Sequence, residues 1–301
     1  MAALPSLRQL SYLVTLSETL HFTEAARRSF VTQSTLSGGI MELERLLGGV
    51  LVERDRQNVR LTPLGEEVVR RARFLLADAQ DLMRLSREMS EPFTGELHLG
   101  VIPTIAPFVL TPLLQSIGQQ MPKLQLFLHE VQSGQAVERL EHGTLDIVLL
   151  ALPFDTHNLM VQALRDEPLY LVYHEQDKNC VKARTMADLD LSRLLLLEEG
   201  HCLRKHTLSA CSVSDLKQQS SLSASSLPTL IQMVQSQLGF TLLPDIAIKS
   251  GILNALPQLK VKAIDQAPMR TLALLTRKST PLHAEFEQLA EVLKPIVSYI
   301  G

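Results

Sequence analysis

Apolar and polar positions along the first sixty residues predict three short helices followed by a hairpin. Leucines recur at helical spacing in the first twenty residues, and two more short helices are predicted to open at Thr23 and near Thr32. Two apolar stretches, at residues 50–53 and 59–61, then flank a polar turn. Three helices followed by such a hairpin are typical of a winged helix-turn-helix, which we place at residues 1–62.

The third predicted helix has an apolar face and a polar N-terminal end. Leu36, Ile40 and Leu43 fall on one face, which leaves the short polar side chains at the helix start exposed. Such side chains can contact phosphates and base edges of DNA, and hairpin arginines can reach the DNA backbone. The alternative is a three-helix bundle with a solvated arginine loop. The candidate DNA-binding residues on the helix and the hairpin are Thr32, Gln33, Ser34, Thr35, Ser37, Arg54, Arg56 and Arg60.

A heptad pattern follows Pro63, a residue that suits the first turn of a helix. A long helix with an apolar seam is best explained by pairing with a second chain, so we expect a dimerising linker helix at residues 63–91. The alternative is an amphipathic helix that lies on its own domain. The seam positions, spaced alternately by four and three, are Val68, Ala72, Leu75, Ala79, Leu82, Ser86 and Met89.

Beyond Gly95 the pattern alternates strands with helices, which predicts an α/β domain with a mainly parallel sheet. The alternation continues in a second unit from residue 168, and a strand at 270–276 and a helix at 281–299 close the chain. Ligands enter open α/β sheets at the carboxyl ends of strands. Thr104, which follows the first strand, is therefore a candidate pocket residue, and a plain helix cap is an equally good explanation of it.

The stretch from Glu198 to Cys211 carries the candidate chemistry. It follows an aliphatic run that predicts a buried strand, Gly200 breaks the pattern, and the next nine residues favour a helix. Cys202 is therefore expected at a strand-to-helix junction. There the unpaired amides of the helix start would favour a thiolate, helped by the neighbouring side chains of His201, Arg204, Lys205 and His206.

The second cysteine of this stretch, Cys211, stands nine positions after Cys202. Nine residues of straight helix span about 13.5 Å, whereas a disulfide needs Cα atoms within about 7 Å. A disulfide between the two would require the helix to unwind, which is how a redox switch could be built. Two alternatives stay open: both cysteines are inert small side chains, or they bind a metal together with His201 and His206.

Composition adds limits to this picture. The chain has 301 residues, enough for two or three domains, and its 46% hydrophobic content is that of an ordinary globular protein. Three cysteines, no basic-then-apolar leader and no apolar run of about 20 residues predict a cytoplasmic protein without a membrane partner. The net charge of -3 counts mildly against DNA binding. No nucleotide-binding or His-Glu-x-x-His motif is present, so neither a cofactor nor a metal is predicted.

The order and spacing of the N-terminal motifs resemble the LysR-type transcriptional regulators. That resemblance implies a non-enzymatic regulator that binds double-stranded promoter DNA, forms homodimers and homotetramers, and acts with RNA polymerase. The sequence departs from the usual pattern at Ser34, Gly38, Gly39 and Met41. The matching positions are residues 21–26 and 31–37, then Ile40, Leu43, Glu44, Leu47, Gly48, Leu51, Glu53, Arg54, Leu61, Thr62 and Gly65.

The same resemblance implies a two-lobed sensor domain, similar to periplasmic binding proteins, behind the linker helix. The chain would cross to the second lobe near residue 164 and return near residue 268. This assigns lobe I to residues 92–164 and 268–301, and lobe II, with the redox cysteines, to residues 165–267.

Within the LysR family the chain is similar to the OxyR subfamily, whose members sense hydrogen peroxide. The similarity implies that Cys202 reacts with peroxide, that Cys211 resolves the product as a disulfide, and that Thr104, His201 and Arg204 orient peroxide or polarise the thiol. It also implies reduction by glutaredoxin or thioredoxin and control of antioxidant genes. The residues that carry the similarity are 100–104, 122–124, 129–130, 200–204, 211 and 224–227.

Three positions depart from the OxyR pattern. Lys205 stands where Asp is usual, Ser133 where Thr is typical, and Ser223 where Arg is often found. Two other functions stay open. One is a LysR-type regulator that binds a small anion between the lobes, and the other is a thiol peroxidase or disulfide oxidoreductase. The absence of a Cys-x-x-Cys motif and the large DNA-binding and dimerising module argue against the last.

Overall fold

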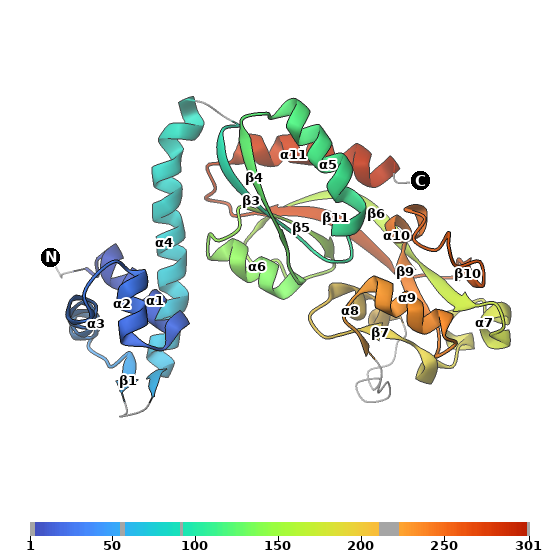
Figure 1. The fold of residues 1–301 in the computed structure, drawn as a ribbon, viewed down its shortest axis with the longest axis horizontal. Coiled ribbons are helices and arrows are strands. Elements are labelled where there is room, and N and C mark those ends of the chain that lie inside the picture. Colours follow the sequence, from blue (N-terminus) through green and yellow to red (C-terminus); the bar gives the residue numbers. More distant parts are fainter. Residues whose placement is uncertain (1–3, 55–57, 91–92, 211–222, 300–301) are drawn as a thin grey trace. The chain divides into compact units, whose positions relative to one another are not determined.

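The computed structural model describes residues 4–54, 58–90, 93–210 and 223–299. The chain divides into two compact units, Met1–Met89 with Glu141–Thr144, and Ser90–Leu140 with Leu145–Gly301. Figure 1 labels the elements of both. In the described ranges, no helix combines the length and the apolar character that a membrane crossing requires.

The first unit packs three helices against the beginning of a long fourth helix. Polar caps start two of them: Ser6 accepts a hydrogen bond from the amide of Gln9, and Thr32 from that of Thr35. Buried leucines and alanines fill the core, and β1 pairs with β2 as an antiparallel hairpin. The predicted winged helix-turn-helix is confirmed. Its elements are α1 (Leu7–Thr19), α2 (Phe22–Arg28), α3 (Gln33–Leu47), β1 (Val52–Arg54), β2 (Val59–Leu61) and α4 (Pro63–Ser90).

Gly39 has a packing role in this unit. A Cβ atom there would lie 2.8 Å from Cδ2 of the Tyr12 ring, closer than side chains can approach. A Cβ atom on the neighbouring Gly38 would meet nothing within 4 Å. The departure from the family pattern at Gly39 therefore lets α3 lie close to α1.

A seven-stranded sheet runs through the second unit. Its strands are β3 (Gly95–Val101), β4 (Leu124–Glu130), β5 (Ile147–Leu152), β6 (Met160–His174), β9 (Thr241–Pro244), β10 (Leu259–Lys262) and β11 (Met269–Thr276). The order is β10-β6-β11-β5-β3-β4, and β9 also pairs with β6. Only β3, β4 and β5 are parallel to one another; β11, β9 and β10 pair antiparallel. The prediction of a mainly parallel sheet is right for the first three strands and wrong for the whole sheet.

The first lobe surrounds the parallel strands. Its helices are α5 (Ala106–Gln120), α6 (Ser133–Glu141) and α11 (His283–Tyr299). The chain moves outward from β3 to β4 and then back past β3 to β5, so α5 and α6 lie on opposite faces. Figure 1 shows α5 and α11 together on one face and α6 on the other. The carboxyl ends of β3 and β4 therefore open into loops that lead to different faces.

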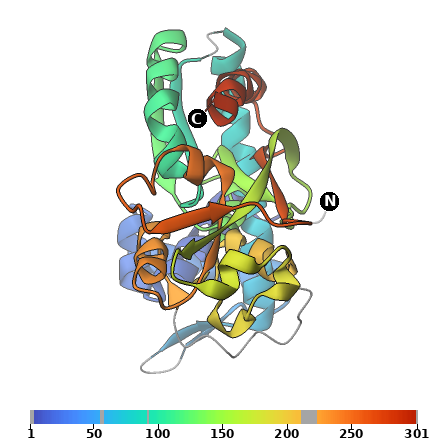
Figure 2. The same cartoon turned by 90° about the vertical axis from the view of Figure 1, so that its right-hand side faces the viewer.

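The second lobe has its own apolar core, separate from that of the first. β6 enters both lobes: its first half pairs with β11, and its second half pairs with β9 and β10, which Figure 2 shows from the second-lobe side. Residue 164 lies within β6, and residue 268 directly precedes β11. The remaining elements are α7 (Lys178–Lys182), η1 (Met186–Asp188), η2 (Leu191–Arg193), β7 (Leu196–Leu197), α8 (Cys202–Ala210), β8 (Ser223–Ala224), α9 (Leu227–Gln235) and α10 (Asp245–Lys249).

Candidate functional site

Cys202 is the first residue of α8, directly after a turn at Gly200. Gly200 has a φ of +98°, a conformation that side chains disfavour. A Cβ atom there would lie 2.1 Å from Oε1 of Gln132. The turn therefore needs glycine for both its backbone and its close contact with Gln132. The predicted junction between the aliphatic run and a helix is confirmed.

α8 packs against both lobes. Cys202, only 2% exposed, belongs to the apolar core of the first lobe, whereas Leu203 belongs to that of the second. His206 stands one helical turn after Cys202, on the same face of α8, and is 3% exposed. Its Nε2 lies 3.0 Å from the carbonyl oxygen of Pro153, directly after β5. Since a carbonyl only accepts, Nε2 carries the proton and donates it across the lobes.

A cavity of about 520 Å³ is lined in part by His201, the residue before Cys202. Its wall combines the loops after β3 and β4 with the loop after β8, the turn before α8 and the start of α9. Apolar residues from both lobes, among them Phe108, Val131 and Leu227, make up about half of the wall. Glu130 is the one acidic side chain among the described lining residues, and none of them is Lys or Arg. The polar lining residues are Thr104, Glu130, Gln132, Gln135, His201, Ser225 and Ser226.

His201 connects this cavity with the start of α8. Its ring is buried, and its Nε2 lies 3.3 Å from the Nε2 amide nitrogen of Gln132, which can only donate. Burial lowers the pKa of His201, partly offset by the raising effect of Glu198 and Glu130. Next to Gln132, the Oγ of Ser133 is buried and has no hydrogen-bond partner in the part of the chain that the structure describes. An unpaired hydroxyl of this kind can bind a small polar molecule.

Thr104 is tied to a buried ion pair on the neighbouring strands. Arg270 of β11 is fully buried, and its Nε donates to Oε2 of Glu167 at 2.6 Å. Its Nη1 donates to Oγ1 of Thr104 at 3.1 Å, while the amide of Ile246 donates to the other Glu167 oxygen. The hydroxyl hydrogen of Thr104 is then available to a molecule in the cavity. Thr104 does not cap α5, because the N-cap residue is Ile105 and makes no side-chain cap bond.

The expected positive charge around Cys202 is only partly present. Burial and the nearby Arg270 lower the pKa of His206, as burial does for His201, so both rings are neutral near pH 7. Nη1 of Arg204 donates to the Leu197 carbonyl at 3.0 Å. Lys205 is exposed, with its Nζ 5.4 Å from the centroid of the Phe154 ring. Of the four side chains predicted to favour the thiolate, the two histidines therefore contribute no positive charge near pH 7.

Of the other two cysteines, the structure describes only Cys180. Cys211 lies outside the described residues, and α8 ends one position before it, at Ala210. Cys180 is buried in the second lobe, where burial and the neighbouring Asp177 raise its pKa to about 12. Its thiol is therefore protonated and unreactive near neutral pH. Within the described ranges, no group of three or more side chains suited to hold a metal ion is found.

The N-terminal end of α3 carries the candidate DNA-binding side chains. Thr32, Gln33, Ser34 and Thr35 are exposed, and Ser37 is half-buried. Oγ1 of Thr32 lies 2.9 Å from Oγ of Ser34, and Gln33 accepts a hydrogen bond from Thr23 of α2 at 3.0 Å. Local hydrogen bonds thus hold several of these side chains at one end of the helix.

The hairpin contributes arginines to the same unit. Arg60 of β2 is exposed. Arg54 lies on β1, although its side chain is not among those described, and Arg56 lies outside the described residues. Arg60 is thus the one candidate hairpin arginine whose side chain the structure describes.

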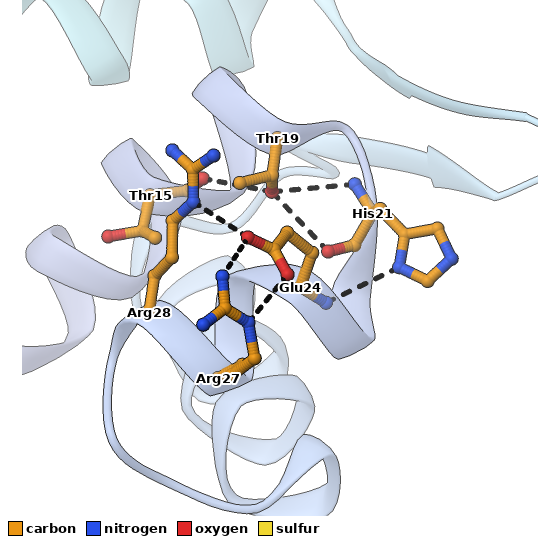
Figure 3. A network of polar contacts seen from close by, with 6 residues as sticks. All are labelled: Thr15, Thr19, His21, Glu24, Arg27 and Arg28. Atoms are coloured by element: carbon orange, nitrogen blue, oxygen red, sulfur yellow. Dashed lines mark hydrogen bonds and ion pairs between the residues drawn. The ribbon is translucent and has the colours of Figure 1, made fainter.

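A charged network lies within α2 and its N-terminal cap (Figure 3). The carboxylate of Glu24 accepts from Arg27 at 2.7 and 2.8 Å and from Arg28 at 2.9 Å. These hydrogen bonds hold the pKa of Glu24 at about 2. Nδ1 of His21 accepts from the Glu24 amide, which caps the helix. Both arginines are thus paired within their own helix.

The predicted seam of α4 is partly exposed in the single chain. Val68 and Ala72 pack against the core of the first unit, whereas Leu75 is 52% and Leu82 is 70% exposed. The side chains of Ser86 and Met89 are not among those described. An apolar row of this kind on a charged helix is available to a partner.

Comparisons with known proteins identify the family to which both units belong. Residues 7–66 match the model of bacterial regulatory helix-turn-helix proteins of the lysR family, and residues 90–296 match the LysR substrate binding domain. Among curated proteins, the chain is 71% identical to the HTH-type transcriptional regulator EstR of Acinetobacter baylyi, over 99% of each chain. It is 37% identical to the DNA-binding transcriptional dual regulator OxyR of Escherichia coli, over 96% of this chain and 95% of the other.

Solved structures agree with these relatives. A variant of full-length OxyR from Pseudomonas aeruginosa matches 97% of this chain and 98% of its own, with a TM-score of 0.72 and 33% identity. A peroxide-bound OxyR mutant from Corynebacterium glutamicum matches 100% of this chain and 95% of its own, with a TM-score of 0.62 and 29% identity. With the winged helix-turn-helix and the two-lobed α/β unit, these matches show that the chain belongs to the LysR family of transcriptional regulators and is related to OxyR.

Proposed function

We propose that this LysR-type regulator responds to hydrogen peroxide, through oxidation of Cys202 and a disulfide between Cys202 and Cys211, and thereby controls antioxidant genes. The observation that carries the proposal is the position of Cys202 on α8. It is buried against the first lobe, and the residue before it lines a cavity with several polar groups. The kinship with OxyR supports the same assignment.

The proposed reaction has two steps. The Cys202 thiolate attacks one oxygen of hydrogen peroxide, so that a sulfur–oxygen bond forms, the oxygen–oxygen bond breaks and the second oxygen leaves as hydroxide. The hydroxide takes up the thiol proton and becomes water. The Cys211 thiolate then attacks the sulfenic sulfur and displaces a second hydroxide, which leaves as water with the Cys211 proton. Two thiols and one peroxide thus give one disulfide and two waters.

The chain supplies donors for the departing hydroxide. The free hydroxyl hydrogen of Thr104 and the amide of Gln132 come from the loops after β3 and β4, and the unpaired hydroxyl of Ser133 belongs to the first residue of α6. His201 is a neutral acceptor that holds Gln132, and Arg204 holds the turn before α8. We assign Thr104 and His201 to peroxide orientation and Arg204 to support of the thiol.

Oxidation would be read out through α8. A disulfide needs Cα atoms within about 7 Å, so Cys202 and Cys211 cannot be joined across a straight helix of nine residues. We infer that α8 unwinds and leaves the first lobe when the disulfide forms. The linker residues 63–91 would pass the change from lobe I (92–164 and 268–301) and lobe II (165–267) to the DNA-binding residues 1–62.

Promoter activity in cells tests the thiol chemistry. Cys202→Ser should abolish activation by a peroxide pulse while the purified variant still binds promoter DNA, because the first unit is unchanged. Cys211→Ser should allow the sulfenic acid but prevent the disulfide. Cys180→Ser serves as the control and should respond as wild type, since its thiol is buried and protonated. Equal activation of wild type and Cys202→Ser would refute the redox mechanism.

The partners follow the same proposal. α3 and Arg60, with Arg54 and Arg56, would contact double-stranded operator DNA, and the exposed Leu75 and Leu82 of α4 would pair two chains into homodimers that assemble into tetramers. RNA polymerase would receive the activating signal in the cytoplasm, and glutaredoxin or thioredoxin would reduce the disulfide. Light scattering at micromolar concentration tests the seam: a monomeric mass would contradict it.

The cavity supports a second candidate function, regulation by a small-molecule effector. About 520 Å³ is far more than a peroxide molecule needs, and half of the wall is apolar. With Glu130 and without a described Lys or Arg, this wall suits a neutral or cationic molecule better than the anion first considered. Under this alternative Cys202→Ser keeps its promoter response, and Leu227→Trp, which fills the cavity, loses it.

A further inference from the structure

We propose that His206 is a positioning residue that latches α8 to the first lobe, and that protonation of its ring opens this latch. The latch holds Cys202 in its buried resting position. An effect of the latch on the oxidation of Cys202 rests on the proposed function, whereas the latch itself does not.

The latch is one contact between two lobes. His206 stands on the helix that carries Cys202, and its Nε2 donates to the carbonyl oxygen of Pro153 at 3.0 Å. Pro153 directly follows β5 in the first lobe, and the next residue, Phe154, lies under Lys205. Two successive residues of α8 thus meet two successive residues of the first lobe. Because Cys202 lies on the His206 face, this contact holds the thiol in the core of the first lobe.

The second ring nitrogen explains why the latch can open. Nδ1 of His206 is buried and has no hydrogen-bond partner in the described part of the chain. A neutral ring tolerates this, because the nitrogen then carries only a lone pair. A proton on Nδ1 would place an unpaired donor and a full charge in a buried position, which is costly unless the side chain moves into water.

The charged groups around His206 oppose protonation. Arg270 of β11 is the cation whose field reaches the ring, and its own carboxylate partner is Glu167 of β6. On α8 itself Lys205 adds a second cation, exposed to solvent. His201, at the turn before α8, also titrates, under the influence of Glu198 and Glu130. Burial lowers the pKa of His206, against the raising effect of the Pro153 contact.

The direction of the pH effect follows from linkage. An exposed histidine has a pKa of about 6.5, and the docked ring has a lower one. The undocked form therefore binds protons more readily than the docked form. Docking is fully favoured above about pH 6.5 and weakens as the pH falls below that value.

Thiol labelling of the reduced full-length protein tests the latch without peroxide. Cys202 is labelled with 4,4'-dithiodipyridine at pH 7.5 and pH 5.5, and peptide mass spectrometry follows its rate. Wild type is compared with His206→Gln, whose amide can donate to Pro153 but does not titrate. The ratio of the two rates at each pH removes the intrinsic pH dependence of the probe.

The latch predicts that the ratio of the wild-type to the His206→Gln labelling rate rises as the pH falls. At pH 7.5 the wild type and His206→Gln should be labelled within about twofold of each other. At pH 5.5 the wild type should be labelled about five- to tenfold faster, since one pH unit below 6.5 shifts the equilibrium by at most about tenfold. A ratio that is the same at both pH values overturns the proposal.

Two further variants test whether His206 acts as a hydrogen-bond donor and whether it is the source of the pH effect. His206→Leu lacks the donor and should be labelled about fivefold faster than wild type at pH 7.5; labelling no faster than wild type overturns the donor role. His129→Gln changes a β4 histidine whose partners are His98 and Arg139, and it should keep the acid acceleration. If His129→Gln removes that acceleration, His206 is not its source and the proposal fails.

The outcome is independent of the peroxide chemistry. If the ratio of the wild-type to the His206→Gln labelling rate changes with pH but Cys202 resists peroxide, the latch is supported and the redox proposal is refuted. If the ratio is constant with pH but the disulfide forms, the redox proposal is supported and the latch is refuted.

Discussion

α3 and α8 both begin with the residues proposed to carry function, and the two helix starts differ in burial and in hydrogen bonding. At α3, Thr32, Gln33 and Ser34 are exposed. Thr32 caps the helix and is hydrogen-bonded to Ser34, and Gln33 accepts a hydrogen bond from α2. At α8, Cys202 and His206 are buried, while Nδ1 of His206 lacks a partner among the described residues. The beginning of α3 is an exposed, hydrogen-bonded surface, whereas α8 makes a buried contact that leaves one polar atom without a partner.

This difference indicates which of the two helices can move at a low cost in free energy. Buried polar atoms without partners cost free energy, so an element that holds them gains when it moves into water. α8 is also divided between two apolar cores, whereas α3 belongs to one. We therefore expect conformational change at α8 and rigidity at α3.

The largest effect should come from the buried ion pair behind Thr104. Arg270→Met leaves Glu167 charged and without its partner, both side chains being fully buried, and should lower the free energy of unfolding by about 3–5 kcal/mol. Urea unfolding measures this change. Lys260→Met is the matched control, because its pair with Glu175 at 3.2 Å is exposed and should cost less than about 1 kcal/mol. Equal losses in the two variants would contradict the role given to burial.

An intermediate effect is expected at the glycine pair of α3. Gly39→Leu would press a side chain onto Tyr12 and should cost about 1–3 kcal/mol of unfolding free energy. Gly38→Ala faces open space and should instead stabilise the helix by about 0.5–1 kcal/mol. Thermal unfolding followed by circular dichroism compares the two. If Gly39→Leu were as stable as Gly38→Ala, the close approach of α1 and α3 would be wrong.

The smallest effect concerns the exposed network of Figure 3. Because the pKa of Glu24 is lowered to about 2, its ion pairs are complete above its ordinary value of about 4.5 and are lost as the pH falls from there toward 2. A carboxyl titration by NMR should show this low midpoint. In the double variant Arg27→Gln and Arg28→Gln the midpoint should return toward 4.5; an unchanged midpoint would exclude the arginines as its cause.

Local patterns in the sequence were sufficient for the elements of the site. Gly200 and the run without Pro or Gly after it located α8, and the rule that ligands meet strand ends pointed to Thr104. Thr32 was recognised as the start of α3 because its cap is a local feature. Each of these inferences depends on neighbours within a few positions.

Contacts between distant residues could not be predicted in this way. Arg270 and Glu167 are 103 positions apart, and nothing local marks either as fully buried. His206 was counted as a cation because burial, which makes its ring neutral, is a tertiary property. The first half of β6 was missed, since Pro168 looked like the beginning of a strand and instead marks where the partner changes from β11 to β9 and β10.

The most direct test of the redox switch is peptide mapping under non-reducing conditions, before and after a brief peroxide pulse to the full-length protein. We predict free Cys202 and Cys211 before the pulse and a peptide pair joined by a Cys202–Cys211 disulfide afterwards, with Cys180 still free. Both cysteines remaining unmodified at a peroxide dose that activates the promoter would contradict the account.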